Sequence, residues 1–150
     1  MTAISFYAVE TDGAITRILP GKRMNEGTPL EEWADKEIRE YLAGERRDFS
    51  FPVRARGTAF QCAVWDVTRA IPYGERRTYA EIAEAIGTRA YRAVGTALAK
   101  NPVPLFIPCH RVVGKTDLGG YAFGLEMKRE LLEMERRSVE RSSLSDDFPF

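Results

Sequence analysis

The first twenty residues contain two apolar-rich stretches on either side of a single turn signal. The stretches are AISFYAVE (residues 3–10) and AITRIL (residues 14–19), and the turn is Asp12-Gly13. Asp-Gly is a preferred two-residue connection between antiparallel strands. The pattern therefore predicts a β-hairpin at the start of the chain.

Apolar positions then recur at helical spacing in residues 28–44. This periodicity predicts an amphipathic helix, with Thr28 as its N-cap and Gly44 as its end. The apolar stripe comprises Leu30, Trp33, Ala34, Ile38, Tyr41 and Leu42. Residues 45–57, with Pro52 and Gly57, are typical of a connector, so we place a boundary between two lobes there.

The second half of the chain has the pattern of a helical lobe. Helices are expected over residues 58–71, 78–87, 88–101 and 123–137, with Thr78 and Thr88 as N-caps of the middle pair. The two short helices that meet at Gly87-Thr88 predict a helix-turn-helix. Residues 103–107 form a short buried extended segment, and the polar residues 138–150 are expected to form a flexible tail. The predicted fold is α+β, with an N-terminal α/β lobe (1–56) and a mostly helical lobe (57–137).

Composition narrows the class of protein. The 150 residues are 44% hydrophobic and 29% charged, as in ordinary globular proteins. No apolar run approaches the roughly 20 residues needed to span a bilayer, and the N-terminus lacks a signal-peptide pattern. Two cysteines make no disulfide framework, and Cys62, Cys109 and His110 are too few for a structural zinc site. We therefore expect a cytoplasmic protein without membrane association or a metal.

Charge is distributed unevenly although the net charge is zero. Residues 53–115 carry 10 basic and 4 acidic side chains, a balance of +6, whereas the segments on either side each carry −3. One interpretation is a surface that faces nucleic-acid phosphates. The other is that these charges only cover solvated helix faces.

The predicted helix at residues 88–101 is thin. Its small side chains are Ala90, Ala93, Gly95, Ala97 and Ala99. Such a helix can pack closely against a neighbouring helix. Alternatively, it can lie in a narrow groove of DNA and push Arg92 into the base stack.

The only histidine, His110, directly follows Cys109 in the sequence IPCHRVVG. Adjacent residues of a strand point to opposite faces, so contact between the two needs an irregular turn or a bridging water. A helix-like turn after Pro108 would direct backbone N–H dipoles at the sulfur and favour the nucleophilic thiolate. The alternative is a buried structural cysteine beside a satisfied histidine. Cys62, on a predicted helix with no histidine nearby, is interpreted as inert.

Five motifs together resemble the O6-alkylguanine–DNA alkyltransferase family. They are GTAFQCAVW, IPYGERRTYAEIA, RAVGTALAKNP, IPCHRV and GGYAFGLEMKRELLE, in the family's order and spacing over residues 57–135. The resemblance implies that Cys109 accepts the alkyl group from O6 of guanine, with His110 acting through a water as base. It implies that Glu135 orients His110 and that Tyr79 donates a hydrogen bond to the purine ring.

The resemblance also implies how DNA is bound. Arg92 matches the arginine that fills the space left by the flipped nucleotide, and Thr58, Ala93 and Gly95 are expected to contact DNA. Asn101 matches an asparagine that supports the active-site segment.

The substrate pocket implied by the resemblance comprises Tyr121 and the backbone around Val113 and Ala122, with Phe123 at its rim. The family commonly has glycine at the position of Phe123, so we expect this ring to obstruct bulky adducts. The implied partner is double-stranded DNA that contains O6-alkylguanine, and the protein is expected to act as a monomer. The resemblance further implies a single irreversible turnover that needs no cofactor.

Three other functions remain open from the residues. A cysteine hydrolase would need a histidine brought in by the fold, but the only one is adjacent to Cys109. A non-enzymatic sensor of alkylated DNA would resemble the alkyltransferase-like proteins, which lack the cysteine. A helix-turn-helix regulator would need more base-reading side chains than the thin helix offers.

Overall fold

The computed structural model describes residues 4–146 and begins with the predicted hairpin. Strand β1 (Phe6–Thr11) pairs antiparallel with β2 (Ala14–Pro20), and the register shifts at Val9/Glu10. Asp12 and Gly13 both have positive φ angles, 49° and 83°, as the tightest hairpin turns require. The hairpin prediction is confirmed.

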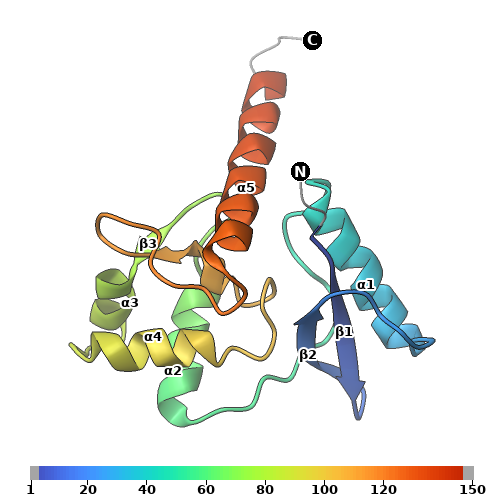
Figure 1. Ribbon diagram of the computed structural model, residues 1–150, viewed down its shortest axis with the longest axis horizontal. Helices are drawn as coiled ribbons and strands as arrows, with labels where there is room; N and C mark the ends of the chain where they lie inside the picture. The colour runs from blue at the N-terminus through green and yellow to red at the C-terminus, as the bar shows by residue number, and fades with distance from the viewer. Residues whose placement is uncertain (1–3, 147–150) are drawn as a thin grey trace.

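Helix α1 (Pro29–Leu42) lies on the hairpin (Figure 1). The Thr28 hydroxyl accepts from the Glu31 N–H and the Glu31 side chain accepts from the Thr28 N–H, a capping box that starts the helix. Ala34, Ile38 and Tyr41 are completely buried, whereas Trp33 is 44% exposed. Trp33 therefore lies at the edge of the apolar stripe and donates its indole N–H to Glu37.

The connector (residues 45–57) is hydrogen-bonded to the hairpin. Ile15 N–H donates to Pro52 O at 2.8 Å, and Arg54 N–H donates to Ile15 O at 2.9 Å. This stretch thus extends the hairpin along β2. A further bond from Ile18 N–H to Pro102 O, at 2.9 Å, joins the hairpin to the helical lobe.

Three helices build the helix-turn-helix region: α2 (Ala59–Arg69), α3 (Tyr79–Ala85) and α4 (Tyr91–Ala99). Thr78 caps α3 as predicted. Thr88 does not cap α4, and this prediction is wrong. Its hydroxyl accepts from Ala90 N–H in the turn, and α4 begins only at Tyr91 without a side-chain cap.

The packing of α4 explains only part of its thin character. Val94, Ala97 and Leu98 are buried, and the indole N–H of Trp65 donates to Ala97 O at 2.8 Å. The remaining small side chains do not face a neighbouring helix, because Ala90, Ala93 and Ala99 are exposed. The tight-packing interpretation is therefore wrong for most of these positions.

The last helix is longer than the sequence predicted. Helix α5 runs from Leu125 to Asp146 and projects from the body (Figure 1), so residues 138–146 are helical. Ser138 is buried and donates its hydroxyl to Gly44 O at 3.3 Å, and on the exposed side Arg136 pairs with Glu133 and Glu140, both at 2.5 Å. The rest of the proposed tail, residues 147–150, lies outside the described residues.

The described helices include none with the length and apolar composition needed to cross a membrane.

Candidate active site

Cys109 lies at the start of a 3-10 helix (Cys109–Arg111) that follows Pro108. It lies on the wall of a cavity of about 570 Å³ and is 7% exposed. A volume of this size suits a small organic ligand. The lining residues are Tyr79, Tyr91, Arg92, Gly95, Leu98, Ala99, Cys109, Gly120, Tyr121 and Ala122.

The predicted turn is present, but the resting sulfur is not a thiolate. Burial raises the pKa of Cys109 above the ordinary value of a thiol. A hydrogen bond with the Asn101 side chain and the charge of Lys128 act in the opposite direction without cancelling this effect. The expected thiolate is thus corrected to a thiol, which needs a base before it can react.

His110 is completely buried and forms a pair with Glu135 of α5, with 2.7 Å between Nε2 and Oε2. Burial lowers the pKa of His110 below its ordinary 6.5, although Glu135 opposes this shift. Hence the imidazole is neutral at pH 7 and can accept a proton.

Several donors hold the carboxylate of Glu135. Arg111 donates its Nε to Oε1 at 2.9 Å, and Gly74 N–H donates to Oε1 at 3.0 Å. Burial alone would raise the pKa of Glu135, but hydrogen bonds from His110 and Arg111 outweigh it and lower the pKa to about 2. Glu135 is therefore ionised and is the acceptor in its pair with His110.

The ionised Glu135 determines the tautomer of His110. Nε2 must carry the proton, because a lone pair there would face the carboxylate oxygen. The other ring nitrogen, Nδ1, is buried and has no hydrogen-bond partner within the described part of the chain. Nδ1 therefore presents an unshared lone pair, as a general base requires.

Arg111 is one of three residues of this centre that the sequence did not predict; the other two are Tyr41 and Lys128. Tyr41, from α1 of the N-terminal lobe, donates its hydroxyl to Glu135 Oε2 and lies 3.1 Å from His110 Nε2.

Lys128, buried on α5, donates Nζ to Val112 O at 2.5 Å and to Gly120 O at 2.9 Å. Burial lowers the pKa of Lys128 to about 8, and the nearby Cys109 opposes this shift. Tyr41 and Lys128 both looked like ordinary helix positions, and only the long-range fold brings them here.

Tyr79 lines the cavity and contacts the loop that contains Gly119 and Gly120. Its hydroxyl accepts from Gly120 N–H at 3.1 Å and lies 3.3 Å from Gly120 O. A side chain at Gly119 could not fit, because its Cβ would lie 2.5 Å from the Tyr79 ring and the φ angle there is +72°. The close approach of Gly119 and Tyr79 thus shapes this wall of the cavity.

Asn101 connects the end of α4 to the segment before Cys109. Its Nδ2 donates to Ile107 O at 2.8 Å, and its Oδ1 accepts from Val103 N–H at 2.9 Å. These bonds hold the turn that precedes Cys109.

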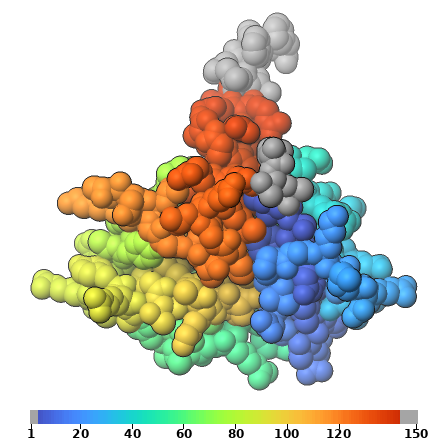
Figure 2. Space-filling view, viewed as in Figure 1, coloured from blue at the N-terminus to red at the C-terminus, as the bar shows by residue number. Residues whose placement is uncertain are grey.

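Arg92 projects from the exposed side of α4 and lines the cavity. Ala93 beside it is exposed, and Gly95 also lines the cavity. Figure 2 shows α4 at the surface of the helical lobe. Thr58 is exposed, but the role that the structure shows for it is to cap α2 together with Gln61.

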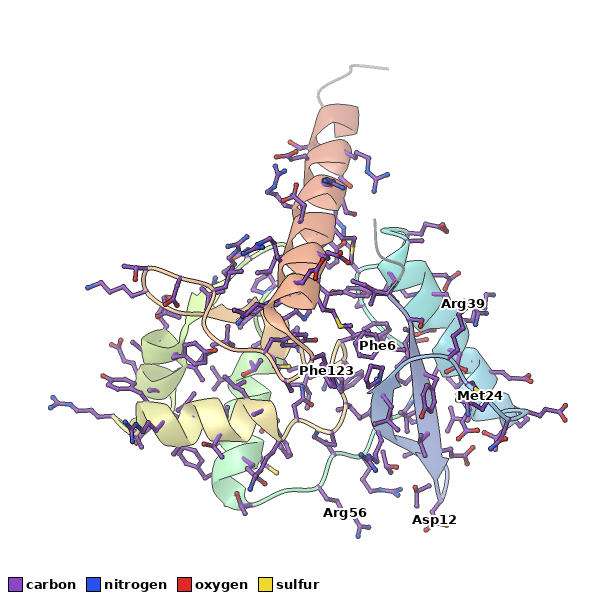
Figure 3. The ribbon with its side chains drawn as sticks, viewed as in Figure 1. Phe6, Asp12, Met24, Arg39, Arg56 and Phe123 are labelled. Atoms are coloured by element: carbon purple, nitrogen blue, oxygen red, sulfur yellow. The ribbon has the colours of Figure 1, made fainter. Side chains whose placement is uncertain are left out.

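The structure corrects two of the predicted pocket residues. Phe123 does not line the cavity, because its ring packs edge-on against Phe6 of β1, with centroids 5.6 Å apart (Figure 3). Val113 is also absent from the lining; it lies in β4 (Val112–Val113), next to Thr78 of β3 (Arg77–Thr78). Tyr121 does line the cavity.

Cys62 lies on α2, half-buried, with its sulfur 3.8 Å from Gly57 O and with no place in the cavity lining. Over residues 4–146, no group of three or more His, Cys, Asp or Glu side chains is arranged to hold a metal ion.

The chain is similar to a defined set of DNA-repair proteins. Residues 59–137 match the family described as 6-O-methylguanine DNA methyltransferase, DNA binding domain. The constitutive methylated-DNA–protein-cysteine methyltransferase of Bacillus subtilis is 50% identical over 114 residues, which cover 74% of this chain and 69% of that protein. The corresponding protein of Metallosphaera sedula is 46% identical, covering 73% and 70%.

Solved structures agree with this relationship. Mycobacterium tuberculosis OGT, crystallised in complex with DNA, superposes with a TM-score of 0.77 at 38% identity. The match covers 89% of this chain and 87% of that one. Since the family match spans more than half of the chain and the relatives share this degree of identity, the protein belongs to the methylated-DNA–protein-cysteine methyltransferase (O6-alkylguanine–DNA alkyltransferase) family.

Proposed function

We propose that this protein repairs DNA by moving the alkyl group of O6-alkylguanine irreversibly onto Sγ of Cys109. The observation that carries the proposal is the position of Cys109 on the wall of a cavity large enough for a flipped base, directly before the histidine of a buried histidine–carboxylate pair. This arrangement combines a nucleophile, a base and a place for a ligand.

The first step is deprotonation of the Cys109 thiol. Nδ1 of His110 accepts the proton directly or through one bridging water, and the resulting imidazolium is stabilised by Glu135 through Nε2. The ammonium group of Lys128 stabilises the developing negative charge on sulfur. A neutral thiol at rest is consistent with deprotonation coupled to substrate binding.

The second step is displacement at the alkyl carbon. A bond forms from sulfur to carbon while the carbon–O6 bond breaks, and the electron pair leaves on the guanine oxygen. The leaving guanine is neutralised by one proton, for which the hydroxyl of Tyr79 on the cavity wall is the candidate donor, and the proton that His110 took from the thiol then replaces the one lost by Tyr79. The buried, unpartnered hydroxyl of Tyr121 can donate a hydrogen bond to the base but keeps its proton, because burial raises its pKa. The product is a thioether without a good leaving group, so one protein molecule acts once.

The exposed face of α4 is the proposed DNA surface. Glycine inside a helix is destabilising by about 1 kcal/mol relative to alanine, yet a Cβ at Gly95 would meet no protein atom within 4 Å. Internal packing therefore does not require glycine at position 95. Close approach of a DNA backbone to α4 would require a residue without a side chain there. Arg92, next to the cavity, is placed to fill the gap that a flipped nucleotide leaves in the stack.

We further propose that the protein acts as a monomer on double-stranded DNA, because one chain supplies the cavity, the base and the helix surface. A non-enzymatic sensor is disfavoured by the presence of Cys109 in the cavity wall.

Incubation with a duplex that contains O6-methylguanine, followed by intact mass measurement, tests the proposal. One methyl group per protein molecule and no further consumption of substrate are expected. Repeated turnover, or binding without any mass change, would contradict it.

A further inference from the structure

The N-terminal lobe contributes a side chain to the catalytic centre. Tyr41 lies near the end of α1, is completely buried, and is separated from Glu135 by 94 positions in the chain. Its hydroxyl contacts both members of the histidine–carboxylate pair. None of the roles described above uses this hydroxyl.

The direction of these hydrogen bonds follows from charge. Glu135 is ionised and accepts the Nε2 proton of His110. Tyr41 carries one proton, and burial together with the charge of Glu135 raises its pKa, so the hydroxyl stays protonated. Since Nε2 already holds a proton, the hydroxyl donates to Oε2 of Glu135.

The ring of Tyr41 also limits movement of the imidazole. It lies against His110, with centroids 6.5 Å apart and planes at 61°, and it is held in turn by Phe49 at 5.4 Å and Tyr73 at 6.1 Å. A rotated imidazole would lose its bond to Glu135. Tyr41 thus restrains both partners through its ring and its hydroxyl.

Resting on the proposed function, we infer that Tyr41 is a positioning residue for alkyl transfer. It holds Glu135 and His110 so that Nε2 keeps its proton and Nδ1 stays available to the Cys109 thiol. The N-terminal lobe is thereby part of the active site and more than a scaffold.

The hydroxyl should also influence how readily His110 is protonated. A donor on Oε2 withdraws electron density from the carboxylate, so its removal makes Glu135 a stronger partner for imidazolium and raises the pKa of His110. The ionisable groups near His110 come from several elements: Glu135 and Lys128 on α5, Cys109 and Arg111 on the 3-10 helix, Tyr41 on α1, and Tyr73 in the loop after α2. The substitution Tyr41→Phe removes the Tyr41 hydroxyl and leaves the other ionisable groups in this list unchanged.

The test compares Tyr41→Phe with Tyr73→Phe, in the full chain. Tyr73 belongs to the same aromatic group, but its hydroxyl contacts Met134 Sδ at 3.4 Å and does not reach the pair. We expect Tyr41→Phe to slow transfer from both free O6-benzylguanine and methylated duplex by ~10-fold, the lower end of the loss seen when a partner that orients a metal-bound histidine is removed. Its affinity for DNA should not change. The pH at which the rate falls on the acid side should move upward in Tyr41→Phe and stay in place in Tyr73→Phe.

A second substitution covers the case in which Tyr41→Phe does not fold. Site-specific replacement of Tyr41 by 3-fluorotyrosine keeps the ring and makes the hydroxyl a stronger donor, so the acid midpoint should move downward. As His110 is the only histidine, its titration can be followed without assignment by ¹⁵N NMR.

Unchanged rates and acid midpoints in these variants would overturn the role of Tyr41, as would an Nδ1-protonated tautomer in the wild-type protein. Failure of the proposed function looks different, because the wild-type protein itself would then leave Cys109 unmodified.

Discussion

The ring of Phe123 meets the ring of Phe6 edge-on, with the centroids 5.6 Å apart and the planes at 85°. Phe123 also contacts Tyr121 at 5.3 Å, so an aromatic chain runs from β1 to the wall of the cavity. In Figure 2, atoms of the N-terminal lobe lie directly against the segment that leads into α5. Phe123 was expected to obstruct the pocket, but it packs against Tyr121, which lines the cavity, and so supports the cavity wall.

Phe123→Ala should therefore reduce stability without opening the cavity. Loss of this half-buried ring is expected to lower the free energy of unfolding by about 1–3 kcal/mol, measured by denaturant titration. The rate of inactivation by free O6-benzylguanine should not rise, because the ring does not occupy the cavity. Phe60→Ala, which removes a half-buried ring of α2 that does not line the cavity, is the control. Faster inactivation of Phe123→Ala would restore the steric interpretation.

Local signals predicted the parts of the fold that depend on neighbours in sequence. The Asp12-Gly13 turn and the capping residues Thr28 and Thr78 were all identified, because each acts within four positions of the chain. The predicted catalytic residues also meet in space, since Cys109 lies on the cavity wall and His110 contacts Glu135.

Contacts between distant segments could not be predicted. Tyr41 had the pattern of a core helix position, and the family resemblance placed Phe123 at the pocket rim. In the structure, each of these side chains contacts a residue of the other lobe. The prediction that Thr88 caps α4 was wrong because the turn continues to Ala90 before the helix begins. The end of α5 was misjudged because its buried Ser138 and half-buried Val139 meet Gly44 and Gly74 of distant segments, contacts that the sequence pattern does not show.

Arg92→Ala should separate flipping from chemistry. Without the side chain that fills the stack, repair of methylated duplex is expected to slow by ~10- to 100-fold, since flipping costs a few kcal/mol. Reaction with free O6-benzylguanine needs no flipping and should be little affected. Arg89→Ala is the matched control, because Arg89 carries the same charge and is exposed but does not line the cavity. Equal losses on both substrates would argue against the wedge role.

Glu135→Gln should destabilise the protein as well as inactivate it. The substitution leaves the buried guanidinium of Arg111 without its carboxylate, which typically costs about 3–5 kcal/mol. Glu133→Gln, on the exposed side of the same helix, should have little effect on unfolding.

The same pair gives a test by pH. The pKa of Glu135 is lowered from 4.5 to about 2, so its contribution to stability is complete above pH 4.5 and is lost as the pH falls through about 2. Denaturant titrations in this interval should show a steeper loss of stability in the wild-type protein than in Glu135→Gln. Parallel curves would show that Glu135 is not the ionised centre of the cluster.

The identity of the alkylated atom tests the central claim most directly. After reaction with a duplex that contains O6-methylguanine, peptide mapping by mass spectrometry should find the methyl group on Cys109 and none on Cys62, with at most one per molecule. Cys62→Ala should react normally, and Cys109→Ala should bind the duplex without accepting the group. A methyl group on Cys62, or transfer that persists in Cys109→Ala, would contradict the account.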